Sequence, residues 1–287
     1  MKQITVLSGK GGTGKTTIAS SFAVLAGSSV IADCDVDAAN LHLLLHPEVK
    51  TRQEFYTRKA EILDEKCIKC GRCEEECRFG AISDFKVDPI LCEGCGVCTL
   101  VCPVGAVRLS ERVSGYAYIS ETRFGPMCHA RLLPGESNSG KLVALVRENA
   151  RKVAEARGLD LVIIDGAPGI GCPVIASVTG IDLGVVVTEP TMSGLHDMER
   201  ALRLLDHFRV PALVCINKYD LNEEKAEEIV EFCESRGIEV MAKIPFNKAV
   251  TDAMVKGKTI IEYSGRNPAS EEIKKAWKRV LRALNET

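Results

Sequence analysis

Residues 7–17 read LSGKGGTGKTT, a stretch that contains the pattern G-x-x-x-x-G-K-[ST] from Gly9 to Thr16. A short β-branched run, residues 4–8, precedes it, and a run of helical composition, residues 16–26, follows it. In a strand–loop–helix context of this kind, backbone N–H groups and the positive end of the helix bind phosphates. The stretch therefore predicts a nucleotide-binding loop.

The loop residues have distinct expected roles. Lys15 would bridge the β- and γ-phosphates, and the Thr16 hydroxyl would hold Mg²⁺. Lys10 lies too early in the loop to duplicate Lys15 on the same nucleotide. A cation there can reach phosphates bound by a second subunit, as an arginine finger does in trans; a solvated surface lysine is the alternative. The predicted nucleotide-binding residues are Gly9, Gly11, Gly12, Thr13, Gly14, Lys15, Thr16 and Thr17.

Beyond the loop, short apolar runs rich in Val, Ile and Leu alternate with longer helical runs. Strands that are apolar on both faces are typical of a parallel sheet covered by helices on each side. The predicted fold class is therefore α/β, with a doubly wound, mostly parallel sheet. The expected strands include residues 30–33, 161–165, 183–188 and 212–217, and the expected helices include residues 141–157 and 194–208.

Eight of the 13 cysteines lie in an internal repeat. The segment CIKCGRCEEECRFGAI begins at Cys67, and CEGCGVCTLVCPVGAV begins at Cys92, with the cysteines in register. Each copy has the spacing C-x₂-C-x₂-C-x₃-C, in which three thiolates bind one [4Fe–4S] cluster and the fourth binds the other. Cys102-Pro103 matches that pattern fully, whereas Cys77-Arg78 lacks the proline.

The expected ligand sets are therefore crossed between the two copies. One cluster would be bound by Cys67, Cys70, Cys73 and Cys102, and the other by Cys77, Cys92, Cys95 and Cys98. A pair of structural zinc sites is the alternative, although zinc ligands are usually spaced as two separated Cys pairs. A segment so poor in apolar residues needs a metal group to hold it together. We predict a small ferredoxin-like α+β domain at residues 60–112, inserted into an ATPase domain of residues 1–59 and 113–287.

The string KGGTGKTT resembles the deviant phosphate loop of the MinD-type ATPases, a group that includes the nitrogenase iron protein and the Mrp-type cluster carriers. In that family the first lysine marks an ATP-bound dimer, so the resemblance implies that Lys10 crosses a homodimer interface. It also implies that Asp35 orients the attacking water and approaches Mg²⁺, a role that Asp37 is close enough to share. Asp165, at the end of an apolar strand, would hold Mg²⁺, and Asn217 would contact the base.

The identity of the base depends on this resemblance. Asn217-Lys218-Tyr219-Asp220 also fits the N-K-x-D pattern of guanine binders. Because Lys10 is the family's signature of an ATP-bound dimer, we expect the cofactors to be ATP and Mg²⁺, together with two [4Fe–4S] clusters.

Cys172 follows Asp165 by seven residues, in a loop that resembles the family's second switch. The nitrogenase iron protein has a cluster-ligating cysteine at the corresponding place, but Cys128 fits poorly as a second ligand here. The chain also lacks the C-terminal Cys-x-x-Cys of the Mrp-type carriers. One thiolate per subunit cannot complete a four-ligand site, so we favour a small buried apolar cysteine over a metal ligand. Cys34, Cys215 and Cys233 are expected in the core.

Composition limits the choice of partners. A net charge of −2 and 5% aromatic residues argue against nucleic-acid binding. The N-terminus has no secretory signal, and no apolar run is long enough to span a membrane, so we expect a cytoplasmic protein. Residues 270–284 form an amphipathic pattern, which we interpret as a helix docked on the sheet rather than a membrane anchor. Its expected apolar face consists of Ile273, Trp277, Val280, Leu281 and Leu284.

Three functions remain open from the sequence. The first is an ATPase whose nucleotide-driven dimer closure is coupled to electron transfer through the two clusters, toward a redox partner or a metallocofactor client protein. The second is an ATPase that assembles or carries iron–sulfur clusters or metallocofactors, with Cys172 as a candidate ligand. The third is a MinD-like positioning ATPase in which the clusters are structural.

Overall fold

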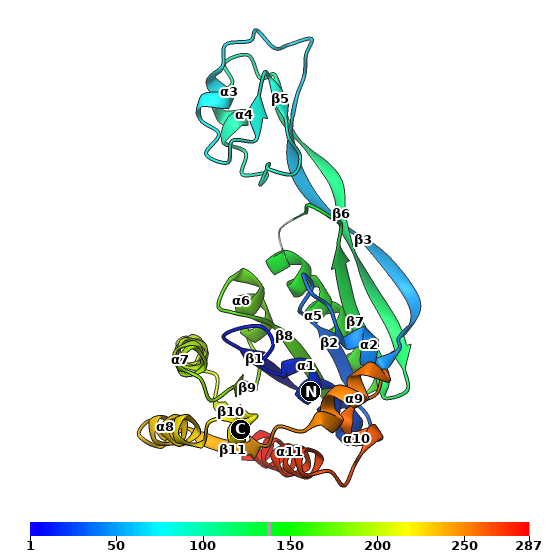
Figure 1. The fold of residues 1–287 in the computed structure, drawn as a ribbon. Coiled ribbons are helices and arrows are strands. Elements are labelled where there is room, and N and C mark those ends of the chain that lie inside the picture. Colours follow the sequence, from blue (N-terminus) through cyan, green and yellow to red (C-terminus); the bar gives the residue numbers. More distant parts are fainter. Residues whose placement is uncertain (137–138, 287) are drawn as a thin grey trace. The chain divides into compact units, whose positions relative to one another are not determined.

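The computed structural model describes residues 1–136 and 139–286 (Figure 1). Within these residues the main sheet has nine strands in the order β11-β10-β9-β1-β8-β2-β7-β6-β3. From β11 to β7 each neighbouring pair is parallel, which confirms the predicted fold class. The strands are β1 (Lys2–Ser8), β2 (Val30–Asp33), β3 (Glu48–Ile62), β6 (Val107–Thr122), β7 (Gly125–Leu132), β8 (Leu161–Pro168), β9 (Leu183–Thr188), β10 (Ala212–Asn217) and β11 (Glu239–Ile244).

Helices cover both faces of this sheet (Figure 1). Helix α1 (Lys15–Ala26) packs against β1, β8 and α11 (Pro268–Glu286), and α9 (Lys248–Val255) and α10 (Ile260–Tyr263) lie beside them. Helices α5 (Ser139–Arg157), α6 (Cys172–Val178) and α7 (Met192–His207) pack on the opposite face, and α8 (Glu223–Glu234) packs on β11. Two short elements, α2 (Leu41–Leu45) and the 3-10 turn η1 (Tyr219–Leu221), complete this part.

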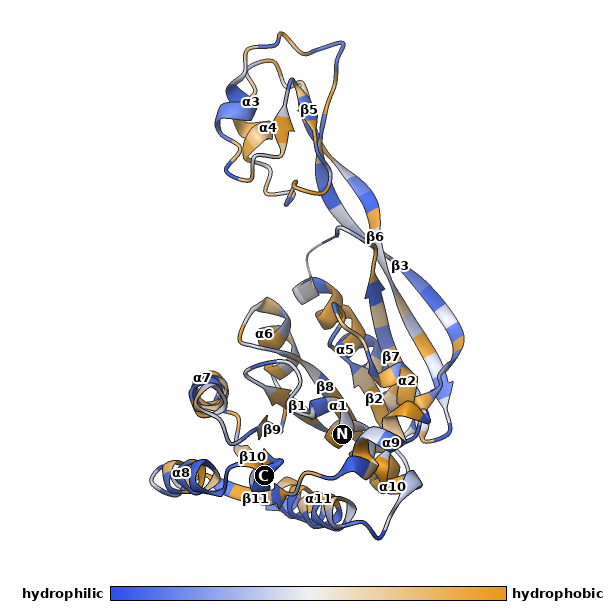
Figure 2. Cartoon of the chain, viewed as in Figure 1, coloured by the Kyte–Doolittle hydropathy of each residue, from blue (hydrophilic) through white to orange (hydrophobic). Residues whose placement is uncertain are grey.

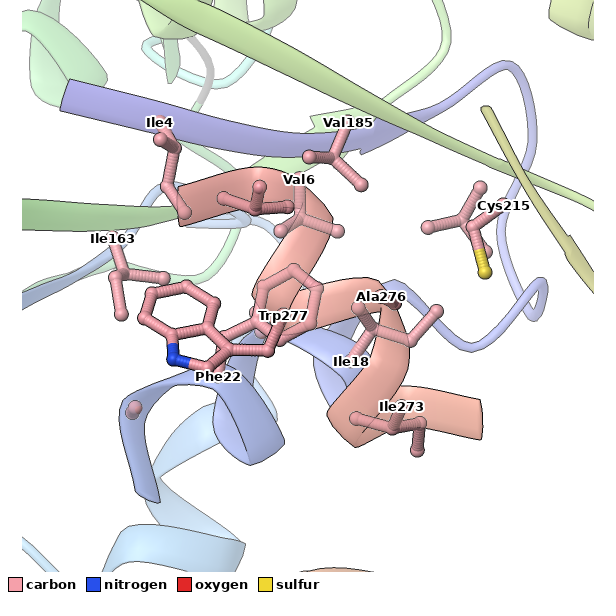
Figure 3. Packing of buried hydrophobic residues seen from close by; sticks show 14 of the residues in the cluster. Ile4, Val6, Ile18, Phe22, Ile163, Val185, Cys215, Ile273, Ala276 and Trp277 are labelled. Carbon is pink, nitrogen blue, oxygen red and sulfur yellow. The ribbon is translucent and has the colours of Figure 1, made fainter. Parts of the chain in front are cut away.

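A large apolar core lies between the sheet and the α1–α11 layer (Figure 3). The rings of Phe22 and Trp277 lie 5.0 Å apart at its centre, and side chains of β1, β8 and β9 surround them. In Figure 2 the helices combine hydrophilic and hydrophobic residues, as amphipathic covering helices do. The predicted docking of the C-terminal helix is confirmed, although Leu281, expected on its buried face, is 41% exposed. No helix in the described part of the chain is long and apolar enough to cross a membrane.

The described chain divides into two compact units. The larger contains residues 1–52, 117–130 and 139–286, and the smaller contains residues 53–116 and 131–136. The smaller unit extends the predicted insert of residues 60–112 at both ends and adds a return segment after β7. Besides parts of β3 and β6 it contains α3 (Arg72–Glu75), α4 (Val97–Val101) and a two-stranded sheet of β4 (Ile82–Ser83) and β5 (Lys86–Val87).

The internal repeat is reproduced in the backbone of the smaller unit. Gly71 and Gly96, 25 positions apart, have φ angles of 80° and 81° and precede α3 and α4. Lys69 and Gly94 also correspond, with φ angles of 54° and 64°. A Cβ atom on Gly94 would lie 1.9 Å from the Arg58 carbonyl oxygen, so glycine is required there. The two copies thus share one local fold, and the second copy approaches β3 very closely at Gly94.

Candidate functional site

The phosphate-binding loop connects β1 to α1, as predicted. Gly12 and Gly14 adopt left-handed φ angles of 81° and 95°, which turn the chain into the helix. Lys15 is the first residue of α1, and its side chain is largely buried. A Cβ atom on Gly14 would lie 2.4 Å from Asn217 Nδ2, so the loop and the end of β10 are in close contact. Asn217 Nδ2 donates a hydrogen bond to the Thr13 carbonyl oxygen at 2.8 Å.

Two buried carboxylates lie beside this loop. Asp33 on β2 and Asp165 on β8 are paired neighbours across the parallel strands, and each is 1% exposed. Both oxygens of Asp165 and the Oδ2 atom of Asp33 have no hydrogen-bond partner. Because a buried, unpaired carboxylate is costly, this arrangement favours a bound cation. Oxygen ligands of this type are those that Mg²⁺ prefers.

Burial perturbs the titration of three acidic residues near the loop. Burial and the neighbouring Asp165 raise the pKa of Asp33 well above its usual range. Burial raises the pKa of Asp165 to about 6, against the opposing effect of the Lys15 ammonium and the Thr16 hydroxyl. The Thr16 hydroxyl is near enough to act electrostatically but lacks hydrogen-bond geometry to Asp165. Burial also raises the pKa of Asp35, again opposed by Lys15, whereas Asp37 is exposed.

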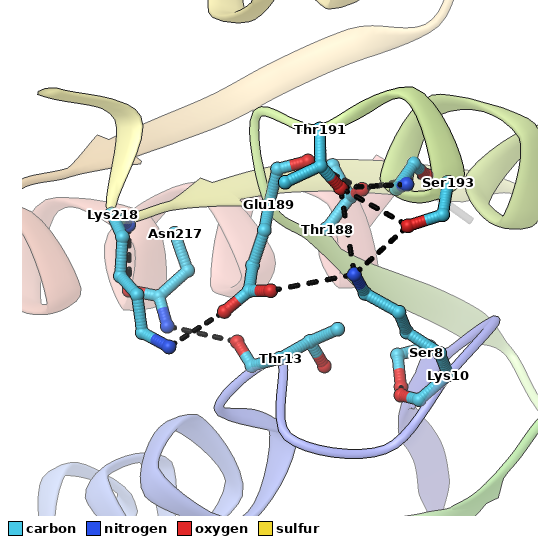
Figure 4. A network of polar contacts seen from close by, with 10 residues as sticks. Ser8, Lys10, Thr13, Thr188, Glu189, Thr191, Ser193, Asn217 and Lys218 are labelled. Atoms are coloured by element: carbon cyan, nitrogen blue, oxygen red, sulfur yellow. Dashed lines mark hydrogen bonds and ion pairs between the residues drawn. The ribbon is translucent and has the colours of Figure 1, made fainter. Parts of the chain in front are cut away.

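Lys10 contacts its own subunit in this structure (Figure 4). Its Nζ atom donates to Ser193 Oγ at 3.1 Å and to Thr191 Oγ1 at 3.4 Å. It also lies 3.7 Å from Glu189 Oε2, and Glu189 Oε1 accepts a hydrogen bond from Lys218 Nζ at 2.6 Å. Glu189 therefore connects the start of the phosphate loop to the residue that follows Asn217.

The cysteines of the repeat line two separate pockets of the smaller unit. Cys67, Cys70, Cys73 and Cys102 line one pocket. Cys77, Cys92, Cys95 and Cys98 line the other. Each pocket thus combines three cysteines of one copy with the fourth of the other copy, which is the crossed arrangement expected from the spacing.

Neither cysteine set forms a compact site for a single metal ion. Among the described residues, no three His, Cys, Asp or Glu side chains converge as the ligands of a single metal ion would. In a cubane cluster each thiolate binds a different iron, so cluster ligands are spread more widely than zinc ligands.

Backbone N–H groups point at several of these sulfurs. Ala81 N donates to Cys77 Sγ at 3.4 Å, and Ala106 N donates to Cys102 Sγ at 3.2 Å, at equivalent positions of the repeat. Burial alone would raise the pKa of Cys102, but the N–H groups of residues 104–107 outweigh it and lower that pKa. N–H donors of this kind stabilise thiolates and adjust the potential of a bound cluster.

Comparisons with known proteins identify the nucleotide-binding part. Residues 4–260 match the model of the CobQ/CobB/MinD/ParA nucleotide binding domain. The chain belongs to this family. It is similar to an uncharacterized protein of Methanocaldococcus jannaschii, with 38% identity over 77% of this chain and 79% of that protein. It is also similar to the iron-sulfur cluster carrier protein of Pyrococcus abyssi, with 24% identity over 99% of this chain and 87% of that protein.

Among solved structures, the cell division ATPase MinD of Pyrococcus furiosus has the same fold. Its TM-score is 0.60 at 18% identity, and the match covers 98% of each chain. The protein is thus a MinD/ParA-type ATPase, and the loop and carboxylates described above form its candidate ATP site.

The candidate site of this ATPase includes residues that sequence reasoning missed. Asp33 was overlooked in favour of Asp35, although the alternating pattern Asp33-Cys34-Asp35-Val36-Asp37 at a strand end could have indicated it. The Asp33 Oδ1 atom accepts a hydrogen bond from Asp35 N at 3.2 Å. Glu189 and Lys218 had no recognisable local signal for the contact that they make.

Asp220 of the N-K-x-D string makes a hydrogen bond within the protein. Its Oδ1 atom accepts a hydrogen bond from Phe246 N at 2.6 Å, while Asn217 is bonded to the phosphate loop. Asp220 therefore has a structural role besides any contact with a base.

Cys172 is exposed at the start of α6, so the prediction of a buried apolar cysteine was wrong. Gly140 of α5 lies close to it, since a Cβ atom there would lie 3.0 Å from Cys172 Cβ. Cys34, Cys128, Cys215 and Cys233 are buried.

The buried carboxylates lead to a pH prediction for the metal-free, nucleotide-free protein. The pKa of Asp165 is about 6 in the folded protein and 3.8 in the unfolded chain, so the folded state binds more protons between these values. Stability is therefore lost as the pH rises from about 4 to 6. We expect Asp165→Asn to be more stable than wild type by about 2–3 kcal/mol above pH 6 and equal to it below pH 4, by thermal denaturation.

Asp37→Asn, which removes an exposed carboxylate from the same segment, is the matched control and should show no such difference. An Asp165→Asn protein less stable than wild type at neutral pH would contradict the interpretation of Asp165 as an unpaired metal ligand.

Proposed function

We propose that this ATPase couples nucleotide-driven closure of a homodimer to electron transfer through two [4Fe–4S] clusters. The observation that carries the proposal is the pair of cysteine-lined pockets, each drawing ligands from both copies of the repeat, on the same chain as an ATP site. A purely structural role would not need two such cysteine sets in one small unit. Two clusters in one small unit are typical of ferredoxins.

The ATP site fits MgATP. Lys15 and the backbone of the loop would bind the phosphates, and Thr16 with Asp165 and Asp33 would hold Mg²⁺ directly or through water. The unpaired buried oxygens of these carboxylates support that assignment. Bound Mg²⁺ would neutralise charge on the transferred phosphoryl group. Asp35, half-buried beside Lys15, would orient the attacking water.

Lys10 would act across the homodimer. Its contacts in the single subunit are exposed hydrogen bonds and a 3.7 Å ion pair, and exposed pairs contribute about 0–1 kcal/mol. That is small against the interaction of an ammonium group with a triphosphate in a closed interface. When the homodimer closes, Lys10 would leave Glu189 and bind the phosphates of the nucleotide held by the partner subunit.

The smaller unit would form the electron path. Cys73 of the first set and Cys98 of the second are both buried in one apolar cluster. Burial raises the pKa of the Cys98 thiol, and the Cys73 thiol adds a smaller contribution in the same direction. The two clusters would thus be close neighbours. Asp35 and this unit are also close in sequence, because the unit begins at Gln53. A switch segment after Asp35 can therefore transmit nucleotide state to the unit through the chain itself.

A carrier function is the second candidate. The similarity to the iron-sulfur cluster carrier protein of Pyrococcus abyssi favours it, and exposed Cys172 offers one thiol for a labile metal centre. A MinD-like positioning role has less support, because the C-terminal helix is packed on the core through Trp277. We propose a cytoplasmic protein whose partner is a redox protein or a metallocofactor client.

Iron content tests the two-cluster assignment. Anaerobically prepared protein should contain about eight irons per chain, and its reduced form should give the EPR signal of two interacting clusters. Cys102→Ala and Cys77→Ala should each remove one cluster, a loss of about four irons, and abolish the interaction signal. Cys233→Ala, a buried cysteine of α8, is the control and should keep all the iron.

Two results would redirect the proposal. A redox-silent protein filled with zinc would end it. Iron beyond two clusters that disappears in Cys172→Ser and passes to an acceptor apoprotein would favour the carrier function instead.

Lys10 gives a separate test of the dimer. Lys10→Met should bind MgATP with nearly wild-type affinity, fail to dimerise in light scattering, and hydrolyse ATP at least about 100-fold more slowly, as loss of a cation supplied in trans does. Lys218→Met, which removes the other cation on Glu189, should still dimerise. Normal dimerisation of Lys10→Met would refute a role across the interface.

A further inference from the structure

Lys59 has a buried ammonium group next to the second set of cysteines. The residue lies on β3 and is 3% exposed. Within the described residues the buried lysines are Lys15, which belongs to the phosphate loop, and Lys59, which the ATP site does not use. Its Nζ atom donates a hydrogen bond to the Cys92 carbonyl oxygen at 2.9 Å.

Glu136 is the counter-charge of Lys59. Its Oε2 atom lies 3.1 Å from Lys59 Nζ, and because this oxygen has no well-directed hydrogen bond the contact is mainly an ion pair. A buried ion pair gains little stability over an apolar pair of the same shape, since both charges lose their hydration. Stability alone therefore gives no reason for a charge at this position.

Lys59 contacts the second cysteine set and is therefore positioned to act more strongly on it than on the first. Ala60 N donates to Cys92 Sγ at 3.3 Å, and Gly94 packs against the Arg58 carbonyl, so β3 touches the second copy of the repeat closely. At the position of Gly94 the first copy has Lys69, which is exposed to solvent. The two sets thus share a backbone fold but differ in the charge and solvation around them.

We propose that Lys59 makes the cluster of Cys77, Cys92, Cys95 and Cys98 easier to reduce than the cluster of Cys67, Cys70, Cys73 and Cys102. The inference rests on the proposed function, because it requires both clusters. Reduction adds one electron to a cluster and hence one negative charge. A fixed positive charge in a buried, weakly screened place stabilises the reduced form more than the oxidised one.

Because Lys59 and Glu136 carry opposite charges, they should have opposite effects on the reduction potential of the second cluster. Lys59 raises the potential of the second cluster, and Glu136 lowers it by partly offsetting Lys59. An electron entering the unit would therefore come to rest on the second cluster, and the first cluster would be the entry or transfer point.

The test is a redox titration of the full-length, anaerobically prepared protein, followed by EPR. Lys59→Met should lower the potential of one of the two clusters, and Glu136→Gln should raise the potential of the same cluster. Cys77→Ala, which removes the second cluster, should eliminate that wave and identify it. Lys59→Arg keeps the charge and should keep the wild-type potential.

The outcomes separate this inference from the proposed function. Wild-type protein without two clusters would refute the function itself. With both clusters present, equal shifts of both waves, shifts in the same direction for Lys59→Met and Glu136→Gln, or no shift would overturn the role of Lys59. If Lys59→Met loses iron, the potentials of Glu136→Gln and Lys59→Arg still test the role of Lys59. An unchanged potential in Glu136→Gln would then contradict the proposal.

Discussion

The parallel pairing of β2 with β8 is the constraint on which the ATP site depends. It places Asp33 and Asp165 side by side at the edge where β1 runs into the phosphate loop. Neither carboxylate is fully hydrogen-bonded, so the folded protein without metal keeps an electrostatic cost that a cation can relieve. Binding of MgATP and stability of the sheet are thereby linked through the same two side chains.

The smaller unit depends on a different interaction. Its apolar cluster consists largely of cysteines and small residues: Ala60, Cys73, Ala81, Ile82, Cys92, Cys98 and Val107. Such a core cannot balance the entropy of ordering the chain by burial alone. Bound clusters would supply the missing stabilisation, so the groups that would transfer electrons would also hold the unit together.

Local patterns predicted most of the architecture. The phosphate loop, the apolar strands and the cysteine repeat are encoded within short windows, and the crossed cysteine sets follow from spacing. The contacts of Glu189 with Lys10 and of Lys59 with Glu136 join residues far apart in the sequence, so no spacing rule could reveal them. Asp33 was missed because three aspartates share one short segment and only the strand register selects between them. Cys172 was misjudged because its exposure depends on tertiary packing, which the sequence around it does not show.

The proposed coupling requires that nucleotide and clusters share one free-energy cycle. The most direct test is to titrate both cluster potentials of the wild-type protein with and without Mg²⁺ and a non-hydrolysable ATP analogue. Coupling predicts that the bound analogue shifts at least one potential, and that reduction changes the affinity for the analogue by the corresponding factor. Identical potentials with the nucleotide site saturated would contradict the claim.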